Sequence, residues 1–226
     1  MNGVTAPTRA IFLDALGTLI ELEPPWVHLR GALGDGVPDD RLRAAVRAEM
    51  RYYRDHSDEG RDPASLADLR RRCAEVLSAE LGRTVDADTL MGAIRFRPYD
   101  DAVPALEALR RRGLTLVCVS NWDCSLPAVL ERCGLGDALD RILTSAATGA
   151  RKPDPAIFRT ALEAAGCAPT EALHVGDTPE EDLEGARAAG VRALLLDRAA
   201  PSNGGGAGTP EPRIASLREI EQYLEP

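Results

Sequence analysis

The chain has 226 residues, of which 44% are hydrophobic and 4% aromatic, and its formal net charge is −9. This composition excludes wholesale disorder and suits one large domain, or a core domain with a smaller domain inserted. The negative charge argues against broad nucleic-acid binding, which relies on Lys and Arg to neutralise phosphates, although a few local cations suffice for a small phosphorylated ligand.

The first predicted element is a short strand over residues 11–13, which ends at a lone carboxylate, Asp14. An ionised carboxylate that is buried without a partner would destabilise the fold by several kcal/mol. We therefore expect Asp14 to lie at the rim of a sheet, where it finds partners, and not in the middle of the core.

The next segment, residues 22–97, contains long helical patterns rich in Arg and Leu and no convincing strand. We predict an all-helical insertion of about four helices, which leaves the sheet after its first strand and rejoins it near Pro98. The sequence thus predicts a core domain made of residues 1–21 and 98–226 and a helical cap domain made of residues 22–97.

Beyond the insertion, short apolar runs alternate with helical patterns. The runs, which have the length of buried strands, lie at residues 114–119, 142–143, 172–175 and 191–196. One helix is expected to begin with Asp154 as N-cap and Pro155 as its first residue. Another is expected to begin with a capping box between Thr178 and Glu181. The alternation predicts an α/β fold with a Rossmann-like parallel sheet covered on both faces.

Residues 201–213 are rich in Gly and Pro, and we interpret them as a solvated loop because they lack the lysine and the helix context of a phosphate-binding loop. No apolar run approaches the ~18 residues of a membrane span, and residues 1–17 show no signal-peptide pattern. The five cysteines contain no CxxC pair, which favours reduced thiols. We therefore expect a cytoplasmic protein without membrane contact, as a monomer or a homodimer.

Polar side chains follow the predicted strands at four points along the chain. They are Asp14 with Thr18, Ser120 with Asn121, Lys152, and Asp177 with Asp182. Ligands of open parallel sheets bind at the carboxyl ends of the strands, so these side chains are expected to converge. The three carboxylates suit a hard cation such as Mg²⁺, and the hydroxyls and the lysine suit phosphate oxygens. Asp14 is also a potential nucleophile, whereas His174, inside an apolar strand, is expected to be a hydrogen-bonded core histidine.

The four clusters, in this order and with a helical insertion after the first, resemble the haloacid dehalogenase (HAD) superfamily over roughly residues 9–198. The matching residues are Asp14, Leu16 and Thr18 in the first motif, Ser120 in the second, Lys152 in the third, and Gly176, Asp177 and Asp182 in the fourth. Each motif alone is weak, but the four together are a strong signal. Longer strings such as "HVGDTPEEDLEGARAAG" look most like the branches of haloacid dehalogenase-like hydrolase domain-containing protein 3 and of the dehalogenases.

The resemblance implies a Mg²⁺-dependent hydrolase that acts on a small phosphorylated substrate through an aspartyl-phosphate intermediate. It implies catalytic roles for Asp14 and Lys152. Substrate contacts are implied for Thr18, Ser120, Asn121 and Lys152, and metal ligation for Asp14, the carbonyl of Leu16, Asp177 and Asp182. The helical insertion looks like the cap that covers such sites.

Leu16 departs from the family pattern, which has an Asp at this position. In family phosphatases that Asp protonates the leaving alcohol and then activates water, and loss of such a group typically costs ~10²–10⁴ in rate. An aryl or acyl phosphate would need the missing acid least. Another carboxylate or His could also replace it, and Glu23, His28 and Asp123 lie in or near loops at the rim.

Two alternatives stay open. Dehalogenases of the superfamily also lack this Asp, so the chain could be a metal-independent 2-haloacid dehalogenase that uses Asp14 as nucleophile. It could also be a catalytically weak or inactive HAD-fold protein that binds a phosphorylated ligand or a partner. The acidic fourth motif favours the Mg²⁺-dependent phosphohydrolase, because Asp177 and Asp182 would repel a substrate carboxylate unless a cation neutralised them.

Overall fold

A central sheet of parallel strands organises the computed structural model, which describes residues 7–34, 36–199 and 212–224. Within these residues the sheet has six strands in the order β5-β4-β1-β6-β7-β8. The strands are β1 (Ala10–Leu13), β4 (Thr115–Ser120), β5 (Arg141–Thr144), β6 (Ala172–Gly176), β7 (Arg192–Leu196) and β8 (Arg213–Ile214). Every neighbouring pair is parallel. The predicted Rossmann-like parallel sheet is therefore confirmed, and β8 adds an edge strand that was not predicted.

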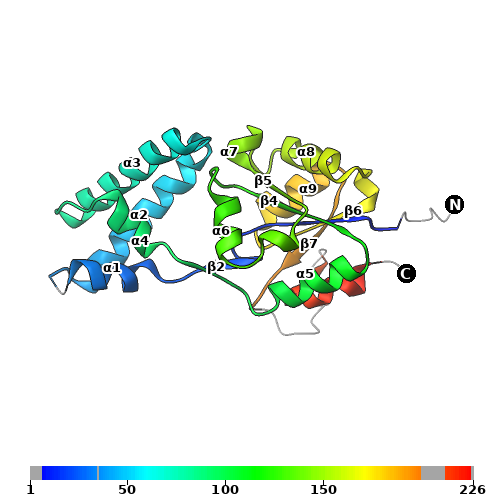
Figure 1. The fold of residues 1–226 in the computed structure, drawn as a ribbon, viewed down its shortest axis with the longest axis horizontal. Coiled ribbons are helices and arrows are strands. Elements are labelled where there is room, and N and C mark those ends of the chain that lie inside the picture. Colours follow the sequence, from blue (N-terminus) through cyan, green and yellow to red (C-terminus); the bar gives the residue numbers. More distant parts are fainter. Residues whose placement is uncertain (1–6, 35, 200–211, 225–226) are drawn as a thin grey trace.

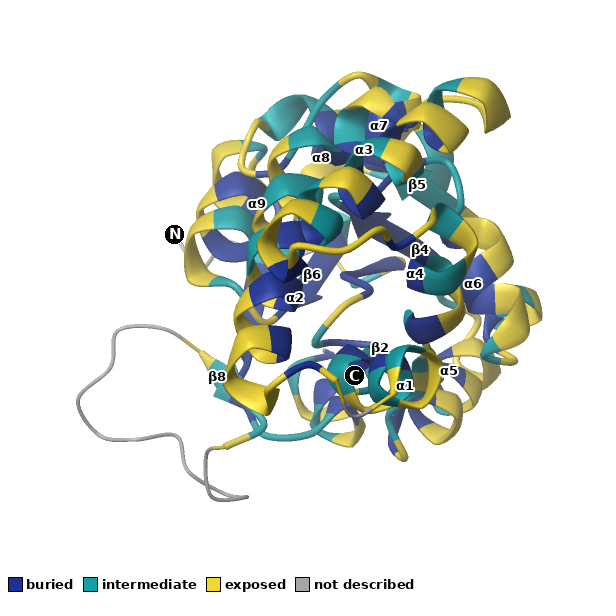
Figure 2. Ribbon diagram, turned by 90° about the vertical axis from the view of Figure 1, so that its left-hand side faces the viewer, coloured by how far each residue is buried: buried dark blue, intermediate teal, exposed yellow. Residues whose placement is uncertain are grey.

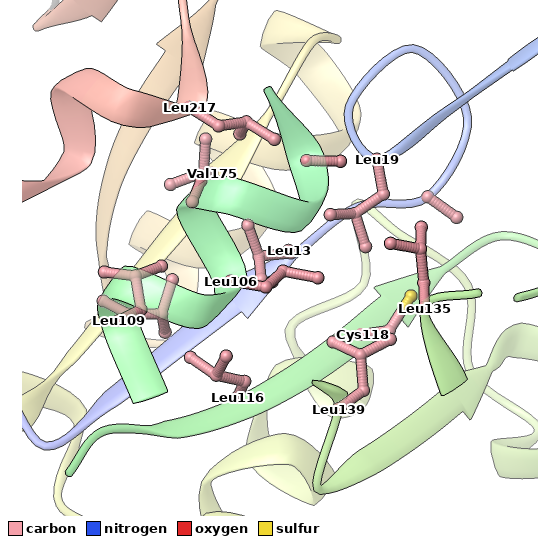
Figure 3. Packing of buried hydrophobic residues seen from close by; sticks show 14 of the residues in the cluster. Leu13, Leu19, Leu106, Leu109, Leu116, Cys118, Leu135, Leu139, Val175 and Leu217 are labelled. Carbon is pink, nitrogen blue, oxygen red and sulfur yellow. The ribbon is translucent and has the colours of Figure 1, made fainter. Parts of the chain in front are cut away.

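Helices cover both faces of this sheet (Figure 1). Strand β1 shows the division, because Ile11 and Leu13 belong to one buried cluster and Ala10 and Phe12 to the other. The first cluster includes residues of α5 (Ala102–Arg111), α6 (Leu126–Arg132) and the 3₁₀ segment η5 (Leu217–Tyr223), and the second includes residues of α8 (Pro155–Ala165), η4 (Pro179–Glu184) and α9 (Gly185–Ala188). Figure 3 shows the first cluster, in which Leu106 and Leu109 of α5 pack beside Leu13 and Leu116 of the strands.

The two helix starts that were predicted behave differently. The Asp154 side chain accepts a hydrogen bond from Ala156 N–H, and Pro155 is the first residue of α8, as expected. The predicted capping box at Thr178 is wrong, because the Thr178 side chain caps nothing and η4 is a π-helical turn. Instead Thr178 N–H donates to the Asp182 carboxylate at 2.9 Å, so Asp182 binds the N–H group that the Glu181 side chain would bind in a capping box.

The inserted helices pack around a core of their own, which includes Leu29, Leu42, Leu69 and Leu77. They are α1 (Pro25–Leu33), α2 (Asp39–His56), α3 (Pro63–Leu81) and α4 (Ala87–Ala93), and the short 3₁₀ turn η1 (Ser57–Glu59) lies between α2 and α3. Outside the insertion are the 3₁₀ turns η2 (Gly136–Ala138) and η3 (Pro169–Glu171) and the short helix α7 (Ser145–Thr148), which follows β5. In Figure 1 helices α1–α4 lie beside one end of the sheet, and Figure 2 looks onto them from that side.

The expectation that residues 22–97 contain no strand is wrong at its two ends. Strands β2 (Ile20–Leu22) and β3 (Phe96–Pro98) pair antiparallel and join the inserted helices to the sheet. Three residues are too few to show an alternating pattern, so this ribbon left no periodicity in the sequence.

The turn between α2 and α3 rests on loops that follow β4 and β5. Cys124 N–H donates to the Gly60 carbonyl at 2.8 Å, and the Arg151 guanidinium donates to Ser57 Oγ at 3.1 Å. A Cβ atom on Gly60 would lie 2.8 Å from the Cβ of Asp123, so only glycine allows this approach. The inserted helices therefore cover the carboxyl ends of the strands.

In the described parts of the chain, no helix combines the length and the apolar character needed to cross a membrane.

Candidate active site

Three charged side chains from separate segments meet at the carboxyl end of β1. Lys152 Nζ donates to Asp14 Oδ1 at 2.7 Å and to Asp182 Oδ1 at 2.5 Å. All three residues are buried, with 7% or less of their surface exposed. Lys152 is also the only lysine in the sequence, which otherwise uses arginine. The predicted convergence of residues 14, 152 and 182 is therefore present in the structure.

The charges of this cluster set the protonation of its members. Burial raises the pKa of Asp14 to about 6, against the opposing effect of the Lys152 ammonium. Burial would lower the pKa of Lys152, but the Asp14 and Asp182 carboxylates raise it overall. Burial would likewise raise the pKa of Asp182, but Lys152 and His174 hold it below its usual range. Asp182 thus stays ionised at neutral pH, and Lys152 stays protonated between two acids.

Both oxygens of Asp182 are fixed by neighbours. His174 Nε2 lies 3.0 Å from Oδ1, and Thr178 N–H donates to Oδ2. His174 is fully buried, which confirms the expected hydrogen-bonded core histidine. A Cβ atom on Gly176 would lie 2.1 Å from Asp182 Cγ, so the glycine of the fourth motif is needed for the carboxylate to reach the lysine.

The acidic residues also suit a cation. Oxygen atoms of Asp14, Asp177 and Asp182 all lie within 4.8 Å of one another. Burial and the nearby Asp182 charge raise the pKa of Asp177, so a bound cation would relieve a real repulsion. Gly17, at φ +85°, brings the first loop so close that a Cβ there would lie 2.1 Å from Asp177 Oδ2. Hard oxygen donors in this number fit Mg²⁺, which keeps waters as its remaining ligands.

Asn121 holds the backbone of Lys152. Its amide Nδ2 donates to the Lys152 carbonyl at 3.0 Å, and its Oδ1 accepts from Lys152 N–H at 2.8 Å. The same Nδ2 donates to Glu181 Oε2 at 2.9 Å. Because these bonds use the polar atoms of its side chain, Asn121 is placed to position the lysine, a role that the sequence did not indicate. Ser120, at the end of β4, is buried and lines the neighbouring cavity.

Thr18 lies away from that cavity. It is fully buried, and its hydroxyl has no hydrogen-bond partner among the described residues. Its carbonyl accepts a hydrogen bond from Arg198 Nη2 at 2.6 Å. Thr18 is not part of the cavity wall, so the expectation that it contacts substrate stays a prediction from the motif alone.

A cavity of about 610 Å³ opens above Asp14, between the sheet and the inserted helices. Its floor includes Asp14, Leu16 and Asp177, and Leu16 is 40% exposed. The inserted helices form part of its wall, with Glu49, Met50, Tyr53, Arg54, Arg70 and Cys73. Leu16 thus faces the space where the family places a carboxylate.

The three replacements considered for the missing acid have other partners. Glu23 Oε2 lies 2.8 Å from His28 Nε2, and neither residue lines the cavity. Asp123 does line it, but accepts hydrogen bonds from Tyr53 Oη at 2.8 Å and Ser125 N–H at 2.7 Å.

Glu49 was missed by sequence reasoning because it reads as a surface glutamate between arginines. Its spacing from Leu42, Ala45 and Val46 places it on the apolar face of α2. Its position on the buried face of α2 was the sequence feature that could have identified Glu49 as a buried carboxyl group.

A parallel sheet with a carboxylate, a buried lysine and an acidic cluster at the carboxyl ends of its strands fits the class of α/β hydrolases. A sequence profile of haloacid dehalogenase-like hydrolases matches residues 8–190, and the chain belongs to this family. The resemblance inferred from the four motifs is therefore confirmed.

Three curated relatives show the range of similarity. The chain is 42% identical over 127 residues to phosphoserine phosphatase of Thermus thermophilus, covering 56% of this chain and 51% of the relative. It is 43% identical over 97 residues to human haloacid dehalogenase-like hydrolase domain-containing protein 3, covering 43% and 39%. It is 32% identical over 206 residues to phosphoglycolate phosphatase of Rhodospirillum rubrum, covering 83% and 79%. The chain thus spans about half or less of the first two relatives and most of the third.

Solved structures of the family share the fold. A HAD phosphatase from Thermococcus onnurineus superposes with a TM-score of 0.66 at 24% identity, covering 96% of this chain and 97% of the other. A 2-haloacid dehalogenase from Pseudomonas syringae gives a TM-score of 0.65 at 25% identity, covering 95% and 97%. Phosphatases and dehalogenases are both neighbours, so the fold alone does not separate the two activities.

Proposed function

We propose that this hydrolase is a Mg²⁺-dependent phosphohydrolase that acts on a small phosphate monoester. The observation that carries the proposal is the set of three carboxylates within 4.8 Å of one another beside a buried lysine. A dehalogenase would gain nothing from Asp177, whose charge repels the carboxylate of a haloacid. The phosphatases among its relatives support the same choice.

In this mechanism Asp14 attacks phosphorus, the bond from phosphorus to the leaving oxygen breaks, and water then hydrolyses the aspartyl phosphate. Mg²⁺ held by Asp14, Asp177, Asp182 and the Leu16 carbonyl would neutralise charge on the phosphoryl oxygens. An ammonium has three N–H donors, and Lys152 gives two of them to carboxylates. The third is left for a phosphoryl oxygen, as is the Ser120 hydroxyl.

The inserted helices complete the site. We propose that residues 22–97 act as a cap domain over a core domain made of residues 1–21 and 98–226. The cavity between them has walls from both parts, which supports a closed site that excludes water from the aspartyl phosphate until hydrolysis.

The test compares hydrolysis of p-nitrophenyl phosphate with Mg²⁺ and in EDTA, in the wild type and in Asp14→Asn. We expect turnover that needs Mg²⁺ and vanishes in the variant, because the amide cannot act as nucleophile. Unchanged turnover in Asp14→Asn would exclude the mechanism.

The second candidate is a metal-independent dehalogenase, and the observation that favours it is Leu16 in the cavity floor, where no proton donor is needed for a departing halide. Release of halide from a 2-haloacid in the presence of EDTA selects this activity. Tight binding of a phosphorylated ligand without any turnover would instead indicate the inactive binding protein.

A further inference from the structure

Glu49 is a buried carboxyl group in the cap that has almost no polar partners. It lies in α2, and only 3% of its surface is exposed. In the described part of the chain it forms no salt bridge, and the neighbouring titratable group that affects its pKa is the Cys73 thiol of α3. Burying a carboxyl without a cation is costly, so its place on the wall of the cavity calls for an explanation.

The other acids of the cavity wall are already engaged. The wall contains Asp14, Glu49, Asp123, Asp177 and Glu181. Asp14 and Asp177 belong to the acidic cluster, Asp123 accepts from Tyr53 and Ser125, and Glu181 accepts from Asn121. Among the described acids that line the cavity, Glu49 alone has neither a cation nor an N–H or O–H donor.

The surroundings of Glu49 favour its protonated form. Burial raises its pKa to about 7, and the one titratable group that acts against this is the Cys73 thiol. A carboxyl group with a pKa near the working pH is the kind of group that can both give and take a proton during a reaction. Leu16, in the floor of the same cavity, can do neither.

We infer that Glu49 protonates the leaving oxygen of the substrate, so that an acid on the cap replaces the one missing at position 16. As the bond between phosphorus and the ester oxygen breaks, the Glu49 O–H passes its proton to that oxygen and the alcohol departs. The Glu49 carboxylate then takes a proton from the water that attacks the aspartyl phosphate. The sum is ester plus water giving alcohol plus phosphate, and the inference rests on the proposed phosphohydrolase function.

The test measures Glu49→Gln on two esters whose leaving groups differ strongly in their need for an acid. p-Nitrophenol leaves readily without a proton, whereas ethanol from ethyl phosphate does not. We expect kcat for ethyl phosphate to fall by ~10²–10⁴, the usual contribution of a general acid, and kcat for p-nitrophenyl phosphate to change little. The matched control is Glu80→Gln, an exposed glutamate of α3, which should change neither.

A rescue experiment separates chemistry from folding. Leu16→Asp in the Glu49→Gln background returns a carboxyl to the cavity floor, and we expect turnover of ethyl phosphate to recover. A cooperative thermal melt of Glu49→Gln confirms that the variant is folded, and Glu49→Asp, which keeps a shorter acid, should retain part of the ethyl phosphate activity.

The outcomes also distinguish a failure of this inference from a failure of the proposed function on which it rests. If the wild type hydrolyses neither ester with Mg²⁺, the proposed function itself fails. If it hydrolyses p-nitrophenyl phosphate but not ethyl phosphate, or if Glu49→Gln slows both esters equally or neither, the phosphohydrolase stands and the role of Glu49 is refuted.

Discussion

Single residues show two opposite ways to bury charge in this protein. Lys152 sits between Asp14 and Asp182, so each charge has a partner, and removal of one partner from such a buried set typically costs ~3–5 kcal/mol. Glu49 has no cation among the described residues and relies on protonation instead. The first arrangement fixes charges in place, and the second keeps a proton available.

The protonation of Glu49 makes the stability of the protein depend on pH. Its pKa rises from 4.5 to about 7 on folding, so the native state binds the proton more tightly than the unfolded state. The resulting stability is fully present below about pH 4.5 and is lost as the pH rises through about 7. At 1.36 kcal/mol per pKa unit, the full loss of stability is about 3 kcal/mol.

We therefore expect Glu49→Gln to be more stable than the wild type at pH 8 and to lose less stability between pH 5 and pH 8. Urea unfolding in EDTA across this range measures the difference, and Glu80→Gln serves as the exposed control. Parallel pH profiles for the wild type and Glu49→Gln would show that folding does not raise the pKa of this carboxyl.

At the scale of secondary structure, the turn after β6 places the acids of the fourth motif. Segment η4 is π-helical, and Thr178 N–H is bound by the Asp182 carboxylate. Gly176 ends β6 directly beneath that carboxylate. The close approach of Gly176 to the Asp182 carboxylate leaves no room for a side chain at position 176. The geometry of the turn and the position of Asp182 are therefore coupled.

Gly176→Ala is expected to destabilise the protein and to impair catalysis. Its Cβ would lie 2.1 Å from Asp182 Cγ, and overpacking of this kind costs ~1–3 kcal/mol. A shift of Asp182 by about 1 Å would also move Lys152 and can cost ~10² in turnover. Thermal unfolding and p-nitrophenyl phosphate hydrolysis are the measurements. Gly92→Ala in α4, where a Cβ meets nothing within 4 Å, is the control, and equal behaviour of the two variants would contradict the coupling.

The sequence predicted long-range convergence better than local detail. Parallel strands bring their carboxyl ends to one edge, so Asp14, Lys152 and Asp182 could be placed together from topology alone. The capping box at Thr178 failed because Asp182 competes for the same N–H group. The spacing of Glu49 from Leu42, Ala45 and Val46 indicates the buried face of α2, but it does not show that this face borders a cavity shared with distant segments of the chain. The predicted loop at residues 201–213 lies outside the described residues except for its last two positions, of which Arg213 begins β8.

For the molecule as a whole, the proposed function depends on how the inserted helices contact the sheet. The contact at η1 joins Arg151 of the core to Ser57 and Asp58, and Ser145 also bonds to the Asp58 carboxylate. Tyr53 bonds to Asp123, and both residues line the cavity. These contacts are polar, which suits the proposed cap that opens for substrate and closes for chemistry.

Arg151→Ala should therefore loosen the cap without unfolding either part. The Arg151–Asp58 pair lies 3.4 Å apart and is partly exposed, and pairs of this kind contribute ~0.2–1 kcal/mol. We expect amide hydrogen exchange in residues 57–60 to accelerate by up to about fivefold, while the amides of β1 and β4 keep their protection. Arg159→Ala, on the exposed face of α8, should change neither region. Acceleration across β1 and β4 as well would mean that the contact stabilises the whole fold, and unchanged exchange in residues 57–60 would mean that Arg151 does not hold the cap.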